Sequence, residues 1–132
     1  MPETNARGLD HLVIGVADLD AAGAFYADLG FRVGARNSHP WGTENRIVQF
    51  PGAFLELITV GDATLIPPHA PRRFSFGAFV RDALARGEGM SMLVLESRDS
   101  TGDAESFRSA GIGDFEPFFF ERQARRPDGS EV

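Results

Sequence analysis

The alternation of apolar and polar residues predicts a strand and a helix at the start of the chain. Leu12–Val16 is a short apolar run rich in β-branched residues, which favours a buried strand. Asp18 is predicted to be a helix N-cap, because its carboxylate can accept hydrogen bonds from amides of the first turn. Gly30 can adopt the left-handed conformation that ends a helix. Between them, apolar residues recur at helical spacing and predict one buried face. These residues are Leu19, Ala22, Phe25, Tyr26 and Leu29. His11 is the polar residue that interrupts the apolar strand pattern.

A second strand, a loop and a hairpin are predicted next. Residues 31–38 have the pattern of a strand weakened by a glycine. Residues 39–43 contain proline and glycine, which indicates a loop. Residues 45–50 alternate in polarity, Pro51-Gly52 is a turn signal, and the mainly apolar residues 53–60 predict the next strand, so the two strands are expected to form a hairpin.

The second half of the chain is predicted to begin with a linker and to repeat the opening unit. Residues 61–73 hold three prolines and predict a connecting loop. The apolar residues between Ser75 and Gly87 recur at helical spacing, which predicts a helix with Ser75 at its start and Gly87 at its end. A shift of 81 residues then places Asp99 on Asp18, in register with further equivalent positions. Those positions pair Leu12, Ile14, Tyr26 and Gly30 with Leu93, Leu95, Phe107 and Gly111. A strand at 90–95, a helix at 100–110 with Phe107 facing inward, and a strand at 115–125 follow.

This repeat divides the chain into four parts. We expect a flexible N-terminus at 1–8, a complete β-α-β-β-β module at 9–60, a linker loop and helix at 61–89, and a truncated second module at 90–132. A module lacking two strands leaves a sheet edge with unpaired amides. We expect the chain to be a piece of a longer protein. The alternative is a homodimer or strand exchange that completes the second module.

Composition narrows the class of protein. A length of 132 residues predicts one domain, and 42% hydrophobic and 24% charged residues are ordinary for a globular fold. The net charge of −6 argues against nucleic-acid binding, which needs a basic face. The chain has no cysteine, which excludes disulfides and thiolate chemistry. No apolar run is long enough to span a membrane, and no signal-peptide pattern is present, so the cytoplasm is expected by elimination.

The opening unit resembles a known superfamily. The duplicated module that begins D-H-L-V-I-G-V-x-D-L-D-A-A-x-x-F-Y-x-x-L-G-F resembles the vicinal oxygen chelate superfamily of glyoxalases and extradiol dioxygenases. The segment H-P-W-G-T-E-N-R-I-V-Q-F-P-G-A-F-L-E-L-I is similar to the glyoxalase-like branch. The resemblance covers about residues 9–132. It implies an α+β fold in which paired βαβββ modules form a curved mixed sheet, with helices outside, around a cleft.

The resemblance also implies positions for a divalent metal. Metal-dependent members take ligands from the first and fourth strands of each module, which correspond here to His11 and Glu56. Both residue types suit Zn, Fe, Mn or Ni. The counterpart of His11 in the second module is Met92, or Ser91 if the register shifts by one residue, and neither is a normal ligand for such an ion. The counterpart of Glu56 lies beyond Val132. The sequence is therefore compatible with two alternatives, a protein that binds one divalent metal and a protein that binds none.

Two carboxylates are candidates for proton transfer. Glu56 interrupts the apolar run F-L-E-L-I, and burial of a carboxylate without a partner is costly. A close pair of His11 and Glu56 would serve as a general base or substrate clamp even without metal. Glu121, on the last predicted strand, is the second candidate for acid–base work. The alternative for Glu56 is an exposed outer face without function.

The predicted loop and the last strand supply candidate substrate contacts. Trp41 could stack on a ligand at the mouth of the cleft, and Thr43 and Asn45 could donate hydrogen bonds to it. Phe119 would face the cleft in one of the two orientations open to its strand. The alternative explanation is that these residues only build a turn and a core.

The sequence therefore predicts a glyoxalase-like protein that acts on a small organic molecule in a cleft. If the protein is an enzyme, metal-assisted lyase, isomerase and dioxygenase reactions are all open. The alternative is a non-catalytic binding protein, similar to the antibiotic-sequestering members of the superfamily.

Overall fold

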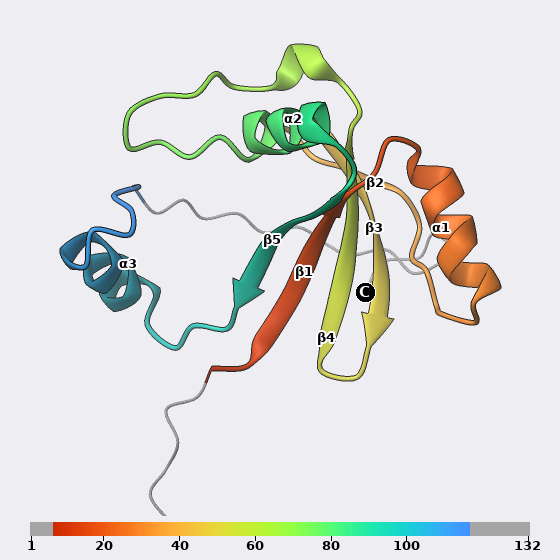
Figure 1. Ribbon diagram of the computed structural model, residues 1–132, viewed down its shortest axis with the longest axis horizontal. Coiled ribbons are helices and arrows are strands. Elements are labelled where there is room, and N and C mark those ends of the chain that lie inside the picture. The colour runs from red at the N-terminus through yellow and green to blue at the C-terminus, as the bar shows by residue number, and fades with distance from the viewer. Residues whose placement is uncertain (1–6, 117–132) are drawn as a thin grey trace, which may run out of the picture.

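The computed structural model describes residues 7–116, which form an open five-stranded mixed sheet with three α-helices (Figure 1). In chain order the elements are β1 (Leu9–Gly15), α1 (Leu19–Asp28), β2 (Asn37–Ser38), β3 (Thr43–Phe50), β4 (Ala53–Val60), the 3-10 turn η1 (Ala63–Leu65), α2 (Phe76–Arg86), β5 (Gly89–Leu95) and α3 (Ser100–Ser109). The strand order is β2-β3-β4-β1-β5. This α+β architecture confirms the predicted fold class.

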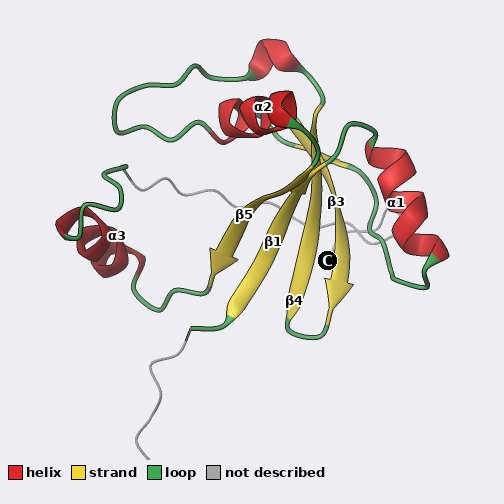
Figure 2. Ribbon diagram, in the orientation of Figure 1, coloured by secondary structure: helices red, strands yellow, loops and turns green. Residues whose placement is uncertain are grey.

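The strand pairing follows from the connections. β3 and β4 form the predicted hairpin about Pro51-Gly52 and pair in antiparallel fashion. β1 lies parallel to β4, which requires the long crossover through α1, β2 and β3. β5 pairs antiparallel with the other edge of β1. Figure 2 shows the extended loop that carries the chain from β4 through η1 to α2.

Alternating side chains give the sheet two apolar faces. On the outer face, Leu57 and Val48 are fully buried in a cluster with Val16 and Leu19 at the start of α1. On the inner face, Val13 and Ile58 are buried against Val80 of α2. Each face therefore owes its core to one helix, and the hydrophobic effect holds both helices on the sheet.

On the inner face, α2 lies over the ends of β1 and β4 rather than their beginnings (Figure 1). A Cβ added at Gly15, the last residue of β1, would lie 3.2 Å from the side chain of Leu84 in α2. The residues that precede Val13 and Ile58 on the same face are His11 and Glu56. The polar end of the inner face therefore lies beside the apolar cluster under α2.

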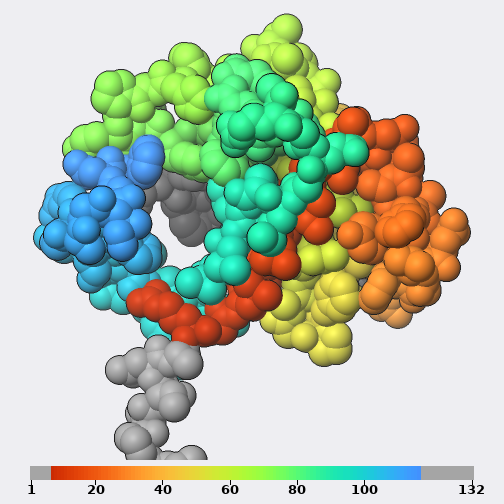
Figure 3. All heavy atoms as spheres, in the orientation of Figure 1, coloured from red at the N-terminus to blue at the C-terminus, as the bar shows by residue number. Residues whose placement is uncertain are grey.

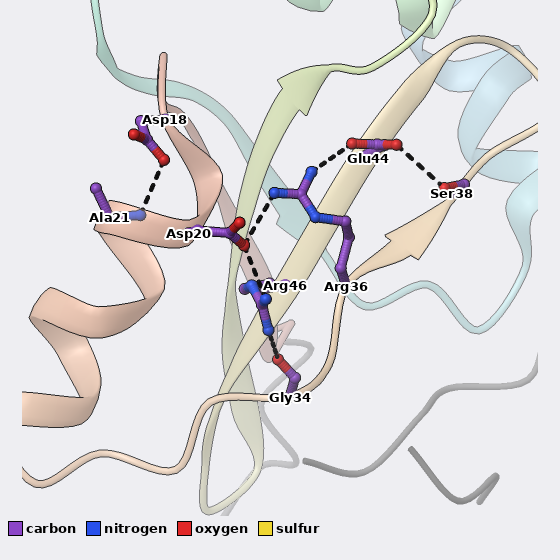
Figure 4. Close-up of polar contacts among 8 residues, drawn as sticks. All are labelled: Asp18, Asp20, Ala21, Gly34, Arg36, Ser38, Glu44 and Arg46. Carbon is purple, nitrogen blue, oxygen red and sulfur yellow. Dashed lines mark hydrogen bonds and ion pairs between the residues drawn. The ribbon is translucent and has the colours of Figure 1, made fainter. Parts of the chain in front are cut away.

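An ion-pair cluster fastens α1 to the outer face. Asp20, in the first turn of α1, lies 2.9 Å from Arg36 and 2.8 Å from Arg46 of β3 (Figure 4). Arg46 also donates to the carbonyl of Gly34, and Arg36 pairs with Glu44. The hydrogen bonds from Arg46 and Arg36 lower the pKa of Asp20. One carboxylate thus joins the helix to β3 and to the segment before β2.

The boundaries of α1 agree with the sequence, but its buried face is narrower than predicted. Asp18 is the N-cap and accepts from the amide of Ala21. Phe25 and Leu29, which were predicted to face the core, are 60% and 59% exposed. The helix turns Leu19 and Gly23 toward the sheet instead. Helical spacing predicts an apolar stripe but not which edge of the stripe meets the sheet.

The predicted strand at 31–38 is wrong over most of its length. Only Asn37–Ser38 forms a strand, and Val33 makes an isolated bridge with Val48. Gly34 donates its amide to the carbonyl of Ile47. The segment therefore lies beside β3 without regular pairing.

α3 begins and ends 81 residues after α1, and Asp99 caps it as Asp18 caps α1. It has no buried residue, and Phe107 is exposed, so the prediction of an inward face for this helix is wrong. Figure 1 shows α3 standing apart from the sheet, and Figure 3 shows the surface hollowed between α3 and β5. Arg7 forms an ion pair with Asp103 of α3.

β5 is an edge strand of the described sheet, with apolar side chains on its outer side. Met90, Leu93 and Leu95 are all exposed, while Met92 and Val94 pack on the inner face. Along residues 7–116, no helix has both the length and the apolar character that a membrane span requires.

Candidate functional site

A row of polar side chains crosses four strands on the inner face. It comprises Asn37 of β2, Asn45 of β3, Glu56 of β4 and His11 of β1. Each is linked to the next by a hydrogen bond or ion pair. Asn45 is fully buried and Glu56 is 6% exposed, so the row lies within the sheet surface rather than in open solvent. Buried polar groups need such partners, which explains the continuity of the row.

The imidazole of His11 is held between two carboxylates. Nδ1 lies 2.6 Å from Oδ2 of Asp10, and Nε2 lies 3.5 Å from Oε1 of Glu56. The ring also stacks on Phe54, with 4.4 Å between ring centroids. Burial lowers the pKa of His11, but the hydrogen bonds and charges of Glu56 and Asp10 outweigh burial, so the pKa is raised. The surroundings therefore favour the imidazolium form.

A bulge in β1 brings Asp10 to the imidazole. Leu9 pairs with Leu95 while His11 pairs with Val94, so Asp10 is the extra residue on β1. In a regular strand, neighbouring side chains point to opposite faces. A bulge redirects a side chain, and here it allows two consecutive residues to meet.

Glu56 is a buried carboxylate with two partners. Asn45 Nδ2 donates to Oε2 at 2.5 Å, and His11 lies beside Oε1. Burial raises the pKa of Glu56, but the hydrogen bonds from His11 and Asn45, together with the charges of His11 and His39, outweigh it. The net result is a lowered pKa, and Glu56 is ionised at neutral pH.

Asn37 and Asn45 orient the carboxylate. Asn37 Nδ2 donates to Oδ1 of Asn45 at 3.1 Å, so the amide nitrogen of Asn45 faces Glu56. Asn37 Nδ2 also lies 3.3 Å from the carbonyl of Ala35. This chain of donors fixes which end of the Asn45 amide meets the carboxylate.

Beside the row, the loop before β3 packs an aromatic pair. His39 is buried, and its Nδ1 lies 2.7 Å from Oγ1 of Thr43. The rings of His39 and Trp41 stack with 4.8 Å between centroids. Trp41 meets Phe76 of α2 edge to face. The loop therefore connects the polar row to the start of α2.

The pair of His11 and Glu56 predicts a pH window of stability. The raised pKa of His11 gives stability that is complete below its ordinary value of 6.5 and is lost as pH rises through the folded-state pKa. The lowered pKa of Glu56 gives stability that is complete above 4.5 and is lost as pH falls through its folded-state pKa. The contribution of the pair is therefore greatest between 4.5 and 6.5.

Urea unfolding of the wild type and of His11→Gln across this range tests the window. The difference in unfolding free energy is expected to be largest between 4.5 and 6.5 and to shrink at alkaline pH. His69→Gln, which changes an exposed surface pair with Asp82, is the control. A difference that grows toward alkaline pH would show that His11 is not held as an imidazolium.

The described residues provide only part of a metal site. His11 and Glu56 offer one nitrogen and one carboxylate, and no group of three or more such side chains that could hold a metal occurs within residues 7–116. Met92, at the position expected for a third ligand, packs in the apolar cluster with Val13 and Ile58. Protein metal sites commonly use three or four ligands. These side chains alone do not fit a metal centre.

Comparison with known proteins shows the family. The model of the glyoxalase-like domain matches residues 9–132. The chain belongs to the glyoxalase-like domain family. This match and the solved structures confirm the resemblance to the vicinal oxygen chelate superfamily. A search of curated proteins found no match.

Several solved structures share this fold of the glyoxalase-like domain. A hypothetical protein from Bacillus halodurans has 18% identity and a TM-score of 0.65, with 95% of this chain and 88% of that chain covered. Methylmalonyl-CoA epimerase from Mycobacterium tuberculosis has 26% identity and a TM-score of 0.62, covering 99% and 80%. A methylmalonyl-CoA epimerase in complex with methylmalonyl-CoA and NH4+ has 23% identity and a TM-score of 0.59, covering 93% and 87%.

In the glyoxalase-like domain, the structure brings together some of the predicted site residues. Glu56 contacts both His11 and Asn45 directly. Thr43 and Trp41 instead contact His39, Thr43 through its hydroxyl and Trp41 by stacking. Glu121 and Phe119 lie outside the described residues.

Sequence reasoning missed Asp10, Asn37 and Phe54. Asp10 adjoins His11 in the chain, and only the bulge makes that proximity useful. Phe54 lies two residues before Glu56 on a predicted strand, and alternation along a strand places both on one face, so this spacing was the available signal for the ring that stacks on His11. For Asn37 no signal was present, because its role depends on pairing with β3.

Proposed function

We propose that this glyoxalase-like domain protein acts on a small organic molecule at the inner face and moves a proton with His11 and Glu56. The observation that supports the proposal is the ion pair between these two side chains, 3.5 Å apart, next to the apolar cluster under α2 on the inner face. A cation beside an ionised, buried carboxylate is a common arrangement for proton abstraction next to a carbonyl group.

The two side chains have different roles in this proposal. Glu56 is the base, and its carboxylate accepts a proton from a carbon of the substrate. Its lowered pKa makes it a weak base, so the substrate must carry a carbon acidified by an adjacent carbonyl or thioester. Protonated His11 stabilises the negative charge that develops on the carbonyl oxygen. Protonation of the carbanion on its opposite face by water inverts the carbon, and Glu56 releases the abstracted proton to solvent, which completes an isomerisation.

Among the open reaction types, isomerase chemistry has the strongest support. Two of the three similar structures described above are methylmalonyl-CoA epimerases. Epimerisation at a carbon requires removal and return of a proton, which is the reaction that this pair can perform. Lyase and dioxygenase reactions are the other members of the expected set.

Deuterium exchange tests the proposal. We expect methylmalonyl-CoA in deuterium oxide to lose the NMR signal of its α-proton faster with the protein than without it. In His11→Gln the exchange rate is expected to fall by about tenfold or more, because the charge beside the developing oxyanion is lost. His69→Gln, which alters an exposed histidine, serves as the control. Equal exchange with and without the protein would contradict proton transfer on this substrate.

A non-catalytic binding protein is the second candidate. The apolar packing of Met92 on the inner face favours this alternative, because the face that would complete a ligand set offers hydrocarbon and sulfur instead. Broadening of the methylmalonyl-CoA signals on addition of protein, without any exchange, would support binding alone.

Metal content distinguishes metal-assisted from metal-free chemistry. Zn, Fe, Mn or Ni at His11 and Glu56 would need further ligands from outside the described residues. We propose metal-free proton transfer by the pair as the simpler arrangement. Stoichiometric metal after purification without chelator, lost in both His11→Gln and Glu56→Gln, would contradict this part of the proposal.

A further inference from the structure

A cavity lies away from the polar row. It has a volume of about 420 Å³ and lies between the loop that follows η1, the start of α2 and the loop that carries Trp41. Its walls are mainly aromatic and proline side chains, and two charged residues join them. The residues that matter here are Trp41, Pro67, Pro68, Phe74, Phe76 and Arg73.

The cavity is separate from the proposed catalytic pair. Its described lining includes neither His11 nor Glu56. One face of Trp41 stacks on His39, which in turn bonds to Thr43, so this aromatic pair stands between the cavity and the polar row. A ligand in the cavity is therefore an inference that goes beyond proton transfer at His11 and Glu56.

The aromatic wall favours a flat ligand. Phe74 lies 6.3 Å from Phe76 and 5.9 Å from Phe115, measured between ring centroids. Trp41 meets Phe76 at 84°, so the rings do not lie flat on one another. Apolar walls with a few polar groups are typical of small-molecule sites. Aromatic rings gain additional energy from stacking or edge-to-face contact with such walls.

Arg73 gives the cavity a positive group. It is exposed on the rim and has no ion-pair partner among residues 7–116. Its neighbour Arg72 lies 3.3 Å from Asp114 and 3.9 Å from Glu116, so the carboxylate of Glu116 at the cavity has a counter-ion. A guanidinium without a partner at the rim of an apolar cavity suits a carboxylate, which it can bind through two hydrogen bonds.

A strained turn sets the position of Arg73. The amide of Arg73 donates to the carbonyl of Ala70, and Arg72 has a φ of +61° at the third position of this turn. That position normally favours glycine or asparagine. Strain of this kind is often found at ligand sites, where the surrounding structure maintains it. Here the backbone bond from Glu116 to the carbonyl of Arg72 helps to hold it.

We propose that this cavity binds a small aromatic carboxylate, with the ring against Trp41 and Phe76 and the carboxylate on Arg73. The chain contains one tryptophan, so its fluorescence reports on the cavity wall. Titration of the 132-residue chain with phenylacetate is expected to change the tryptophan emission with saturation. Phenylacetamide, which lacks the charge, and acetate, which lacks the ring, are expected to bind at least about tenfold more weakly.

Two variants assign the charge. Arg73→Gln is expected to weaken phenylacetate binding by about tenfold and to leave phenylacetamide binding unchanged, because only the ion pair is removed. Arg98→Gln, at an exposed position outside the cavity lining, is the matched control and is expected to bind like the wild type. Equal binding of phenylacetate and phenylacetamide would overturn the proposal, as would an unsaturable change.

Discussion

Replacement of Glu56 by glutamine is expected to lower the pKa of His11. It is also expected to slow the deuterium exchange of the α-proton of methylmalonyl-CoA by two to four orders of magnitude, roughly the contribution of a general base. Glutamine keeps the shape of the side chain and can still accept from Asn45. It removes the negative charge that, with Asp10, holds the imidazolium form. In the variant, Asp10 is the remaining carboxylate that raises the pKa of His11, so burial of the ring, which lowers this pKa, has a larger net effect. Proton NMR of the His11 ring across a pH titration measures the change.

Glu44→Gln is the matched control for this prediction. Glu44 is one strand away on β3 and pairs with Arg36 on the outer face, so its loss leaves the polar row intact (Figure 4). The pKa of His11 and the exchange rate are expected to stay as in the wild type. An unchanged His11 pKa in Glu56→Gln would mean that the pair does not form in solution.

Replacement of Gly77 by alanine is expected to destabilise the protein by about 2 kcal/mol or more. Alanine ordinarily stabilises a helix by about 1 kcal/mol relative to glycine. At Gly77, however, a Cβ would lie 2.4 Å from the carbonyl oxygen of Trp41 and 3.3 Å from side-chain carbons of Ile66. The clash is with backbone, so α2 or the Trp41 loop must move. Urea unfolding and the wavelength of the tryptophan emission measure both consequences.

Gly23→Ala in α1 separates this steric effect from a general effect of alanine in helices. A Cβ at Gly23 would lie 3.0 Å from Cδ of Arg46, which is a side-chain atom and not backbone. A change within about 1 kcal/mol is expected. If the Gly77→Ala variant were as stable as the wild type, α2 would not pack against the backbone of Trp41.

Local signals in the sequence predicted the helices well. Asp18, Ser75 and Asp99 were predicted to lie at helix starts, and each accepts from an amide in the first turn of its helix. Capping involves residues three apart, so the sequence contains the whole interaction. The hairpin about Pro51-Gly52 is equally local.

Features that depend on distant partners were predicted less well. The stretch at 31–38 forms a strand only where Asn37 meets Asn45, and its other contacts with β3 are irregular. The orientation of α3 depends on what packs against it, and helical spacing alone gave the wrong inward face. Propensity is a weak prior where tertiary packing decides.

The candidate site was predicted from one break in a pattern. Glu56 stood out because a carboxylate interrupts an apolar strand, and the structure provides the partners that such burial requires. Asp10 did not stand out, because strand geometry places neighbouring residues on opposite faces. The bulge that overrides this rule arises from the pairing of β1 with β5, which no local pattern reveals.

The apolar outer side of β5 has a consequence for the behaviour of concentrated solutions. Exposed Met90, Leu93 and Leu95 lie on an edge strand of the described sheet, and such an edge can pair with another chain. The net charge of −6 makes copies of the chain repel one another. Added salt screens this repulsion without weakening the apolar contact. Raising the ionic strength therefore promotes self-association, and dilute, low-salt buffers keep the chains dispersed.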